Sequence, residues 1–223
     1  MTPQEFSNEF DILYNNIMSN QAPGLDEYEK SIFLTTAQED LLLELYNGKN
    51  PLGDSFEKTE EIRRYLSDLV KTYTTTDKVE KDAGLSKHSV FFKLPEDLWF
   101  ITYESVNLED AKLKCLDNSD VLVVPVTQDD YHRIKGNPFR KAKDNRVLRL
   151  DLDSNLVELI SEYNISKYFI RYLSKPTPII LIDLPDGLTI NNISNETNCK
   201  LNPLLHRFIV KRAVELASVA YKS

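Results

Sequence analysis

The stretch from residue 147 to residue 173 reads VLRLDLDSNLVELISEYNISKYFIRYL and decides the fold class. Its apolar residues fall into three short β-rich runs, at residues 147–152, 156–161 and 168–173. The Asp, Ser and Asn side chains at residues 153–155 favour a turn, so the first two runs predict a β-hairpin. An antiparallel β region is therefore expected at the centre of this chain.

Further β-rich runs extend this region to between about residues 88 and 190. They lie at residues 90–94, 98–105, 112–116, 121–126 and 179–184. Short runs separated by turn residues are typical of a mainly antiparallel sheet or sandwich. Pro125 and Pro176 cannot donate a hydrogen bond to a neighbouring strand, so each is expected at a sheet edge or a strand end.

Helices are expected on both sides of the β region. Apolar residues at helical spacing predict a helix over about residues 3–19, with Thr2 and Glu5 as a capping box. A C-terminal helix is expected to start at Asn202 and Pro203. The chain is therefore expected to fold as α+β, with N-terminal helices, a central mainly antiparallel β region and a C-terminal helix.

The helical segment between these ends is less regular. Residues 28–46 predict two short helices or one kinked helix, with a second capping box from Thr36 to Glu39. The spacing from Ile62 to Tyr73 predicts another helix, which ends near residues 74–76.

Two domain divisions are compatible with this order of elements. Residues 1–76 form a helical N-terminal segment, and residues 77–223 form a β-rich domain closed by the C-terminal helix. One integrated domain is the alternative.

Composition limits the class of protein. A chain of 223 residues with 41% hydrophobic residues can bury a sizeable core. No apolar run approaches the roughly 20 residues that a membrane-spanning helix needs, and the N-terminus lacks a signal-peptide pattern, so folding in a cytoplasm is expected. Cys115 and Cys199 are expected to be small buried hydrophobic residues, because neither has a pairing motif.

Motifs for catalysis, cofactors and metals are missing from the sequence. Neither GxGxxG nor GxxxxGK[ST] occurs, and the histidines at 88, 132 and 206 are far apart. Asp151, Asp153, Asn155 and Glu162 match ligand positions of a calcium-binding EF-hand loop, but Leu156 occupies the required glycine position. No catalytic residue, cofactor or metal ligand is predicted. An enzyme would need a deep pocket with convergent polar groups in the β region.

Charge is strongly segregated along the chain. Residues 131–149, here called the basic loop, carry Asp144 as their one acid. Its bases are Arg133, Lys135, Arg140, Lys141, Lys143, Arg146 and Arg149. Residues 200–223 are also basic, whereas the whole chain has a formal net charge of −8.

This segregation allows a basic surface on one copy to meet an acidic surface on another. Duplex DNA is the competing partner, since bound phosphates release counterions, and a solvated loop without any partner is the third possibility.

Three stretches carry a resemblance to a known family. They are EYEKSIFLT at 27–35 with LELYNG at 43–48, PVT at 125–127 through Tyr131 to NPFR at 137–140, and LNP at 201–203 through LHR at 205–207 to RAV at 212–214. With these stretches the sequence resembles a virion structural protein of crAss-like tailed bacteriophages, over nearly the whole chain.

The resemblance implies a non-enzymatic protein that forms a ring, commonly twelve-fold, in the neck or tail barrel. Such rings stack below the portal protein, next to neighbouring rings, around the channel through which DNA leaves the head. The expected location is the virion, after assembly in the host cytoplasm, with non-specific DNA contact in the channel open and no membrane involved. A phage accessory protein that binds DNA through the basic loop is the alternative.

Residue chemistry and the resemblance together give a set of candidate subunit contacts in the basic loop. They are Arg133, Lys135, Asn137, Phe139, Arg140 and Lys141. Arg133 and Arg140 are expected to be the strongest, because guanidinium groups bind carboxylates in bidentate geometry.

Overall fold

The structure is a computed structural model that describes residues 1–17, 24–48, 59–81, 84–109, 120–153, 155–185 and 187–221. The chain forms two compact units. The helical unit combines Met1–Leu69 with Pro176–Ser223, and the β unit is Val70–Lys175. The predicted α+β fold is confirmed.

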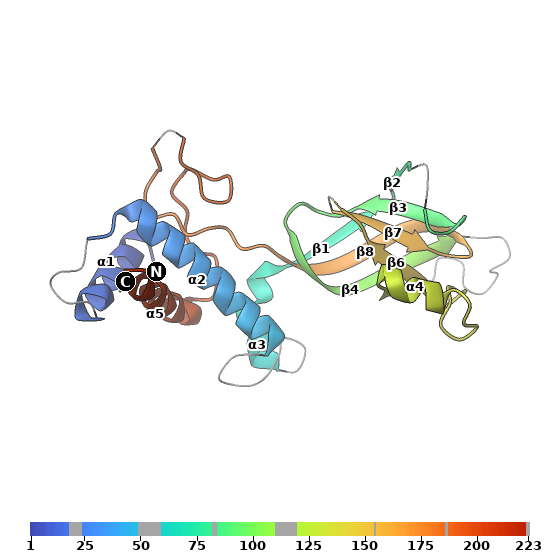
Figure 1. The fold of residues 1–223 in the computed structure, drawn as a ribbon, viewed down its shortest axis with the longest axis horizontal. Coiled ribbons are helices and arrows are strands. Elements are labelled where there is room, and N and C mark those ends of the chain that lie inside the picture. Colours follow the sequence, from blue (N-terminus) through green and yellow to red (C-terminus); the bar gives the residue numbers. More distant parts are fainter. Residues whose placement is uncertain are drawn as a thin grey trace. The chain divides into compact units, whose positions relative to one another are not determined.

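The helical unit is built on three helices that share one apolar core. They are α1 (Pro3–Ile17), α2 (Glu27–Asn47) and α5 (Pro203–Ala220), and a short α3 (Glu60–Tyr65) with a 3₁₀ turn (Ser67–Leu69) follows α2. Helix α5 packs against both α1 and α2 (Figure 1). The core side chains that are fully buried include Phe6, Phe10, Leu34, Ile209 and Ala213.

The predicted starts of the first and the last helix are confirmed. The backbone N–H of Glu5 donates to the Thr2 hydroxyl at 3.2 Å, and the Glu5 carboxylate accepts from the Thr2 N–H at 2.8 Å. Asn202 accepts from the N–H of Leu204 at 3.0 Å at the start of α5. Helices α1 and α5 thus begin with the expected side-chain hydrogen bonds.

Helix α2 is one continuous helix and starts before the predicted second cap. Its capping box is formed by Asp26 and Glu29, and it ends at Gly48 with a left-handed φ of 72°. Thr36 lies inside the helix, where its hydroxyl donates to the carbonyl of Ile32 at 2.9 Å. The expected helix start at Thr36 was therefore wrong.

Side chains of α2 hold an extended segment that follows the β unit. The hydroxyl of Ser31 accepts from the N–H of Leu181 at 3.1 Å, and that of Thr35 accepts from the N–H of Ile179 at 3.1 Å. Gln38, one turn further on, donates to the carbonyl of Thr177 at 2.9 Å. The backbone of this segment is therefore hydrogen-bonded to a helix.

The predicted strand at residues 179–184 was wrong for this reason. Ile179, Ile180 and Leu181 are buried, but the backbone groups of this segment bond to α2 side chains and to Thr197. Ile180 forms only an isolated bridge with Thr197.

The β unit is an 8-stranded, mainly antiparallel sheet with the order β1-β8-β4-β5-β6-β7-β3-β2. The strands are β1 (Val70–Thr75), β2 (Lys78–Val79), β3 (Ser89–Lys93), β4 (Leu98–Glu109), β5 (Asp120–Pro125), β6 (Arg146–Asp151), β7 (Leu156–Ile160) and β8 (Asn164–Ser174). β1 and β2 are consecutive in the chain yet lie at opposite ends of this order, so the sheet curls (Figure 1).

The inner face of this curled sheet forms the second core. It includes Phe92, Val106, Val147, Leu159, Tyr168 and Ile170. The predicted hairpin between the strands at 147–152 and 156–161 is confirmed as the antiparallel pair β6–β7, and Asn155 takes the left-handed turn position with φ of 56°. Pro125 ends β5, as expected.

One sequence-based prediction for this unit was wrong, and another lies outside the described residues. The predicted helix from Ile62 to Tyr73 ends at Tyr65, and residues 70–75 form β1 instead, paired with β8. Those residues read VKTYTT, and β-branched side chains favour strands. The predicted strand at residues 112–116, with Cys115, lies outside the described residues.

Contacts group the C-terminal helix differently from the sequence-based division into residues 1–76 and 77–223. Because α5 buries its apolar face against α1 and α2, it belongs with the helical unit. Among the described residues, none of the helices combines the length and apolar character that crossing a membrane requires.

Candidate subunit-contact surface

The basic loop begins on α4 (Gln128–Ile134), which connects the parallel strands β5 and β6. Thr127 starts the helix by accepting a hydrogen bond from the N–H of Asp130 at 3.3 Å. Tyr131 is buried in an apolar cluster with Ala142, Leu148, Leu150 and Ile160. Residues two apart lie on different sides of a helix, so Arg133 faces solvent while Tyr131 anchors α4 to the sheet.

The tip of the basic loop, residues 137–140, is held by several hydrogen bonds. The Asn137 carbonyl accepts from the N–H groups of Arg140 at 3.1 Å and Lys141 at 2.9 Å, and its side-chain oxygen accepts from Phe139 at 2.9 Å. The guanidinium of Arg146 donates to the Phe139 carbonyl at 2.7 Å. The tip is thus a fixed turn that presents Phe139 to solvent, 83% exposed.

The candidate contacts from the sequence divide into two groups. The exposed group consists of Arg133, Lys135, Phe139 and Arg140. Asn137 is half-buried and shapes the turn, and Lys141 is half-buried with its ammonium 2.8 Å from the Glu162 carboxylate. The structure therefore exposes the Phe139 ring and three cations to solvent, whereas Asn137 and Lys141 make contacts within the chain.

The exposed cations have little internal pairing. The guanidinium of Arg133 is 4.0 Å from Asp130, and its side chain is 86% exposed, so this pair contributes little. For Lys135 and Arg140, no ion pair joins them to any other part of the chain that the structure describes. Their charges are available for a partner.

One basic side chain of the loop, Arg149, has a structural role. Arg149 is buried, with its guanidinium 3.2 Å from Glu104 and 3.2 Å from Asp151. Burial raises the pKa of the Glu104 carboxyl, although the Arg149 charge opposes this shift. Burial next to Glu104 also raises the pKa of the Tyr168 hydroxyl. This base therefore belongs to a buried polar network and not to a contact surface.

Two arginines of the second basic segment, residues 200–223, are paired within the helical unit. The guanidinium of Arg212 lies 3.5 Å from Glu44 and 3.6 Å from Glu215, and Arg207 lies 3.7 Å from Glu9. Its net positive charge is therefore offset locally by acids of α1 and α2.

A groove of about 690 Å³ runs between α1 and the start of α5. Its apolar lining includes Ile12 and Leu204, which are 62% and 64% exposed. Glu5 and Glu9 of α1 line it as well, with Arg207 of α5. Sequence reasoning missed this groove, because both apolar residues lie off the periodic stripe that marks each helix core.

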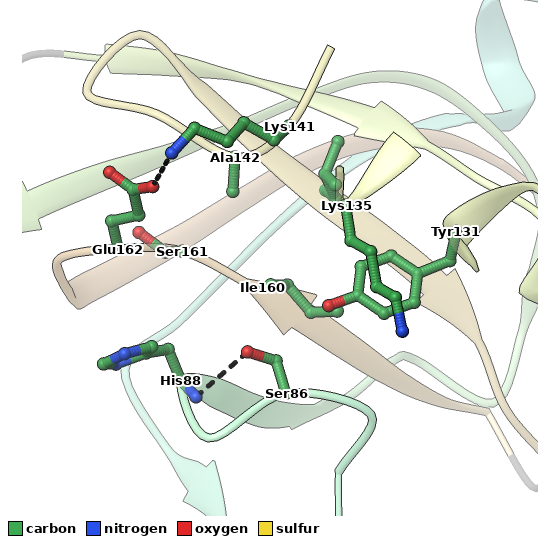
Figure 2. Close-up of a pocket in the computed structure, with 10 residues that line it drawn as sticks. Ser86, His88, Tyr131, Lys135, Lys141, Ala142, Ile160, Ser161 and Glu162 are labelled. Atoms are coloured by element: carbon green, nitrogen blue, oxygen red, sulfur yellow. Dashed lines mark hydrogen bonds and ion pairs between the residues drawn. The ribbon is translucent and has the colours of Figure 1, made fainter. Parts of the chain in front are cut away.

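A smaller pocket of about 190 Å³ lies in the β unit beside α4. Figure 2 shows Lys141 reaching to Glu162 on one side, Tyr131 and Lys135 on another, and His88 with Ser86 below. Its volume is under the roughly 300 Å³ at which typical ligand pockets begin. The hydroxyl of Ser86 accepts from the backbone N–H of His88, so these two residues form a turn.

Metal-ligand side chains do not gather in the part of the chain that the structure describes. Within the described ranges, no group of three His, Cys, Asp or Glu side chains could hold a metal ion. The residues that matched an EF-hand loop lie on the β6–β7 hairpin and beyond it. Cys199 is partly buried, and burial raises the pKa of its thiol.

Comparison with known proteins identifies the family. Residues 1–223 match the family described as phage tail ring protein 3/4. The chain belongs to this family. It is 57% identical over 221 residues to Ring protein 3 of Bacteroides phage crAss001, a match that covers 99% of this chain and 96% of the relative.

A second relative supports the same assignment. Ring protein 4/5 of the same phage is 36% identical over 236 residues, which covers 100% of this chain and 94% of that protein. The resemblance to a crAss-like phage structural protein is confirmed, and this ring protein family is a family of virion components.

Proposed function

We propose that this chain forms a homo-oligomeric ring in the head-to-tail connector of a tailed-phage virion, around the channel through which DNA leaves the head. The observation that carries the proposal is the tip of the basic loop. Phe139 is 83% exposed on a hydrogen-bonded turn, and Arg133, Lys135 and Arg140 of the same loop are exposed as well. Arginine and large aromatic residues are the side chains that most often dominate binding energy at interfaces.

A ring made of identical subunits needs two different, complementary surfaces on each copy. The basic loop supplies one surface. The rest of the chain is acidic enough to bring the formal net charge to −8, so an acidic partner surface is available on the next copy. Opposite charges on the two surfaces favour one orientation and speed encounter.

We propose twelve copies per ring, stacking against the portal protein or a neighbouring ring, and assembly in the host cytoplasm before incorporation into the virion. The role is structural, without a catalytic step. The relatives named Ring protein 3 and Ring protein 4/5 support assembly as rings.

Duplex DNA is a second candidate partner for the same loop. Arg133, Lys135 and Arg140 are exposed cations, and DNA phosphates would pair with them. If all three bind phosphates, the affinity should fall about forty-fold when salt rises from 50 to 200 mM.

Native mass spectrometry over a concentration and salt series separates the two candidates. A closed ring formed by the protein alone, or on addition of a portal or neighbouring ring protein, supports the ring proposal. A monomer that ignores those proteins and binds only duplex DNA, with the expected loss at high salt, would favour the DNA-binding alternative.

A further inference from the structure

We infer that the basic loop docks through its tip into the α1–α5 groove of the neighbouring copy, with Phe139 on Ile12 and Leu204. Arg140 of the tip and Arg133 of α4 then pair with Glu5 and Glu9. This inference rests on the proposed ring function and names the acceptor surface. The occupant is a second copy of this chain.

The groove offers the apolar surface that an aromatic side chain requires. Ile12 and Leu204 are 62% and 64% exposed, so both present apolar surface to solvent. They line the same groove of about 690 Å³, which is larger than the other described hollows and within the range of typical binding sites. Covering them with Phe139 removes three exposed apolar side chains from water in one contact.

The charge of the groove is complementary to the charge of the tip. Helix α1 contains Glu5, Glu9 and Asp11 but no lysine or arginine. Glu5 and Glu9 line the groove on the side of α1. Carboxylates at this position suit the guanidinium groups of Arg133 and Arg140, which can bind them through two hydrogen bonds.

Two cations already line the groove. The Met1 amino group is 2.8 Å from the Nδ1 of His206, and Arg207 is only weakly paired. The guanidinium of Arg207 is 3.7 Å from Glu9, and its side chain is 80% exposed. An exposed pair at this distance contributes little, so an incoming arginine can replace it without a large cost. Within the described residues, the Glu5 carboxylate accepts from the Thr2 N–H at the helix start, which leaves oxygen lone pairs for a partner.

The two surfaces belong to different units of one chain. The tip is part of the β unit, and the groove is part of the helical unit. A contact between them on neighbouring copies is heterologous and leaves a free tip at one end and a free groove at the other. Repetition of such a contact closes a ring when the rotation allows it.

A mixing experiment tests this geometry with full-length protein. The tip variant carries Phe139→Ala and Arg140→Glu, and the groove variant carries Ile12→Arg and Leu204→Arg. All these side chains are exposed, so both variants should fold, as checked by circular dichroism and thermal unfolding. Each variant alone should associate about thirty-fold or more weakly than wild type, because each loses a complete surface.

The mixture of the two variants gives the decisive result. The groove variant still has a tip and the tip variant still has a groove, so native mass spectrometry should show a one-to-one heterodimer that grows no further. Val219→Arg, on the exposed far end of α5, and Lys167→Glu, on β8, are matched controls that should still form rings.

Photocrosslinking maps the contact directly. A benzoylphenylalanine at position 139, in rings made from isotopically light and heavy copies, should crosslink to peptides of α1 or the start of α5 from a different copy. Crosslinks that map elsewhere, or normal rings from the groove variant, would overturn the inference while the ring function stands. Failure of wild-type protein to form a ring under any condition would remove the proposed function itself.

Discussion

The guanidinium of Arg149 lies 3.2 Å from the Glu104 carboxylate, and both side chains are buried in the β unit. The hydroxyl of Tyr168 donates to the other oxygen of Glu104 at 2.8 Å. Asp151, on the exposed side, gives Arg149 its second carboxylate. Removing one member of such a network leaves an uncompensated buried charge, whereas removing both ions does not.

Arg149→Met should therefore lower the free energy of unfolding by about 3–5 kcal/mol. Adding Glu104→Leu to this variant should recover part of the loss, because the buried carboxylate is removed as well while the Tyr168 hydroxyl loses its acceptor. Urea denaturation of the two single variants and the double variant measures the coupling. Additive losses in the double variant would contradict a shared network.

Thr35→Val should destabilise the helical unit by about 1–3 kcal/mol, because it leaves the buried N–H of Ile179 without an acceptor. Thr36→Val is the matched control on the same helix. The Thr36 hydroxyl is exposed and donates only to the helix's own Ile32 carbonyl, so this change should stay within about 0.5 kcal/mol. Equal losses in the two variants would show that helix propensity, and not the contact with the extended segment, is responsible.

Stability should fall as the pH is lowered below the ordinary histidine range, because burial lowers the pKa of His206 from 6.5. The Nδ1 of His206 is 2.8 Å from the Met1 amino group, and its Nε2 is 2.9 Å from the Leu201 carbonyl, as a neutral ring allows. Below a pH of about 6.5 the unfolded chain binds a proton that the folded chain resists, so folding is opposed.

The histidine prediction is checked by urea denaturation at several pH values between 5 and 8. His206→Phe should flatten the dependence in this range. His132→Gln, at an exposed position on α4, should leave it unchanged. A wild-type stability that rises as the pH falls from 7 to 5.5 would contradict a depressed pKa.

The double variant Arg133→Ala and Arg140→Ala should weaken ring formation while the thermal unfolding midpoint stays near that of wild type. Both side chains are exposed, so their removal should not affect the fold. Lys141→Ala should weaken assembly less, because Lys141 is paired with Glu162 within the chain. Sedimentation velocity at matched concentrations measures both effects, and normal rings from the double variant would rule out this role for the loop.

The β unit should fold when residues 70–175 are expressed alone. Val70 at its start pairs with Leu173 near its end, so cutting the chain at these boundaries does not separate a strand from its partner. The fragment should unfold cooperatively and keep the strand signal of the full chain in circular dichroism. A fragment that lacks a cooperative transition would show that the helical unit is needed to fold it.

Short-range signals gave the starts of the first and the last helix correctly. A cap depends on a few adjacent residues, as Thr2 with Glu5 and Asn202 with Pro203 illustrate. Most strands were also predicted, because β6, β7 and β8 have β-rich runs bounded by turn residues. These features could be read from the sequence because their cause is local.

Features with a distant cause could not be predicted. Ile62 to Tyr73 has helical spacing, but residues 70–75 gain hydrogen bonds from β8, a partner about a hundred residues later. The segment at 179–184 looks like a strand, and its hydrogen-bond partners turned out to be hydroxyls of α2. In both cases tertiary contacts decide the local structure.

The candidate subunit contacts also divide into features with a local cause, which could be predicted, and features with a distant cause, which could not. Charge counting identified the basic loop, but only the structure separates the exposed Arg140 from the buried Arg149. The α1–α5 groove needs two segments from opposite ends of the chain, and no local pattern in either one signals it.

The discontinuous helical unit sets an order of events during synthesis. Residues of α1 and α2 leave the ribosome before the β unit, and α5 emerges after it. Domains generally fold as units while the chain is made, so the β unit can be complete before α1 and α2 have α5 to cover their apolar faces. Leu204 and Arg207, which complete the groove, are translated after the whole β unit. A nascent chain can therefore display its tip before it can accept a neighbour.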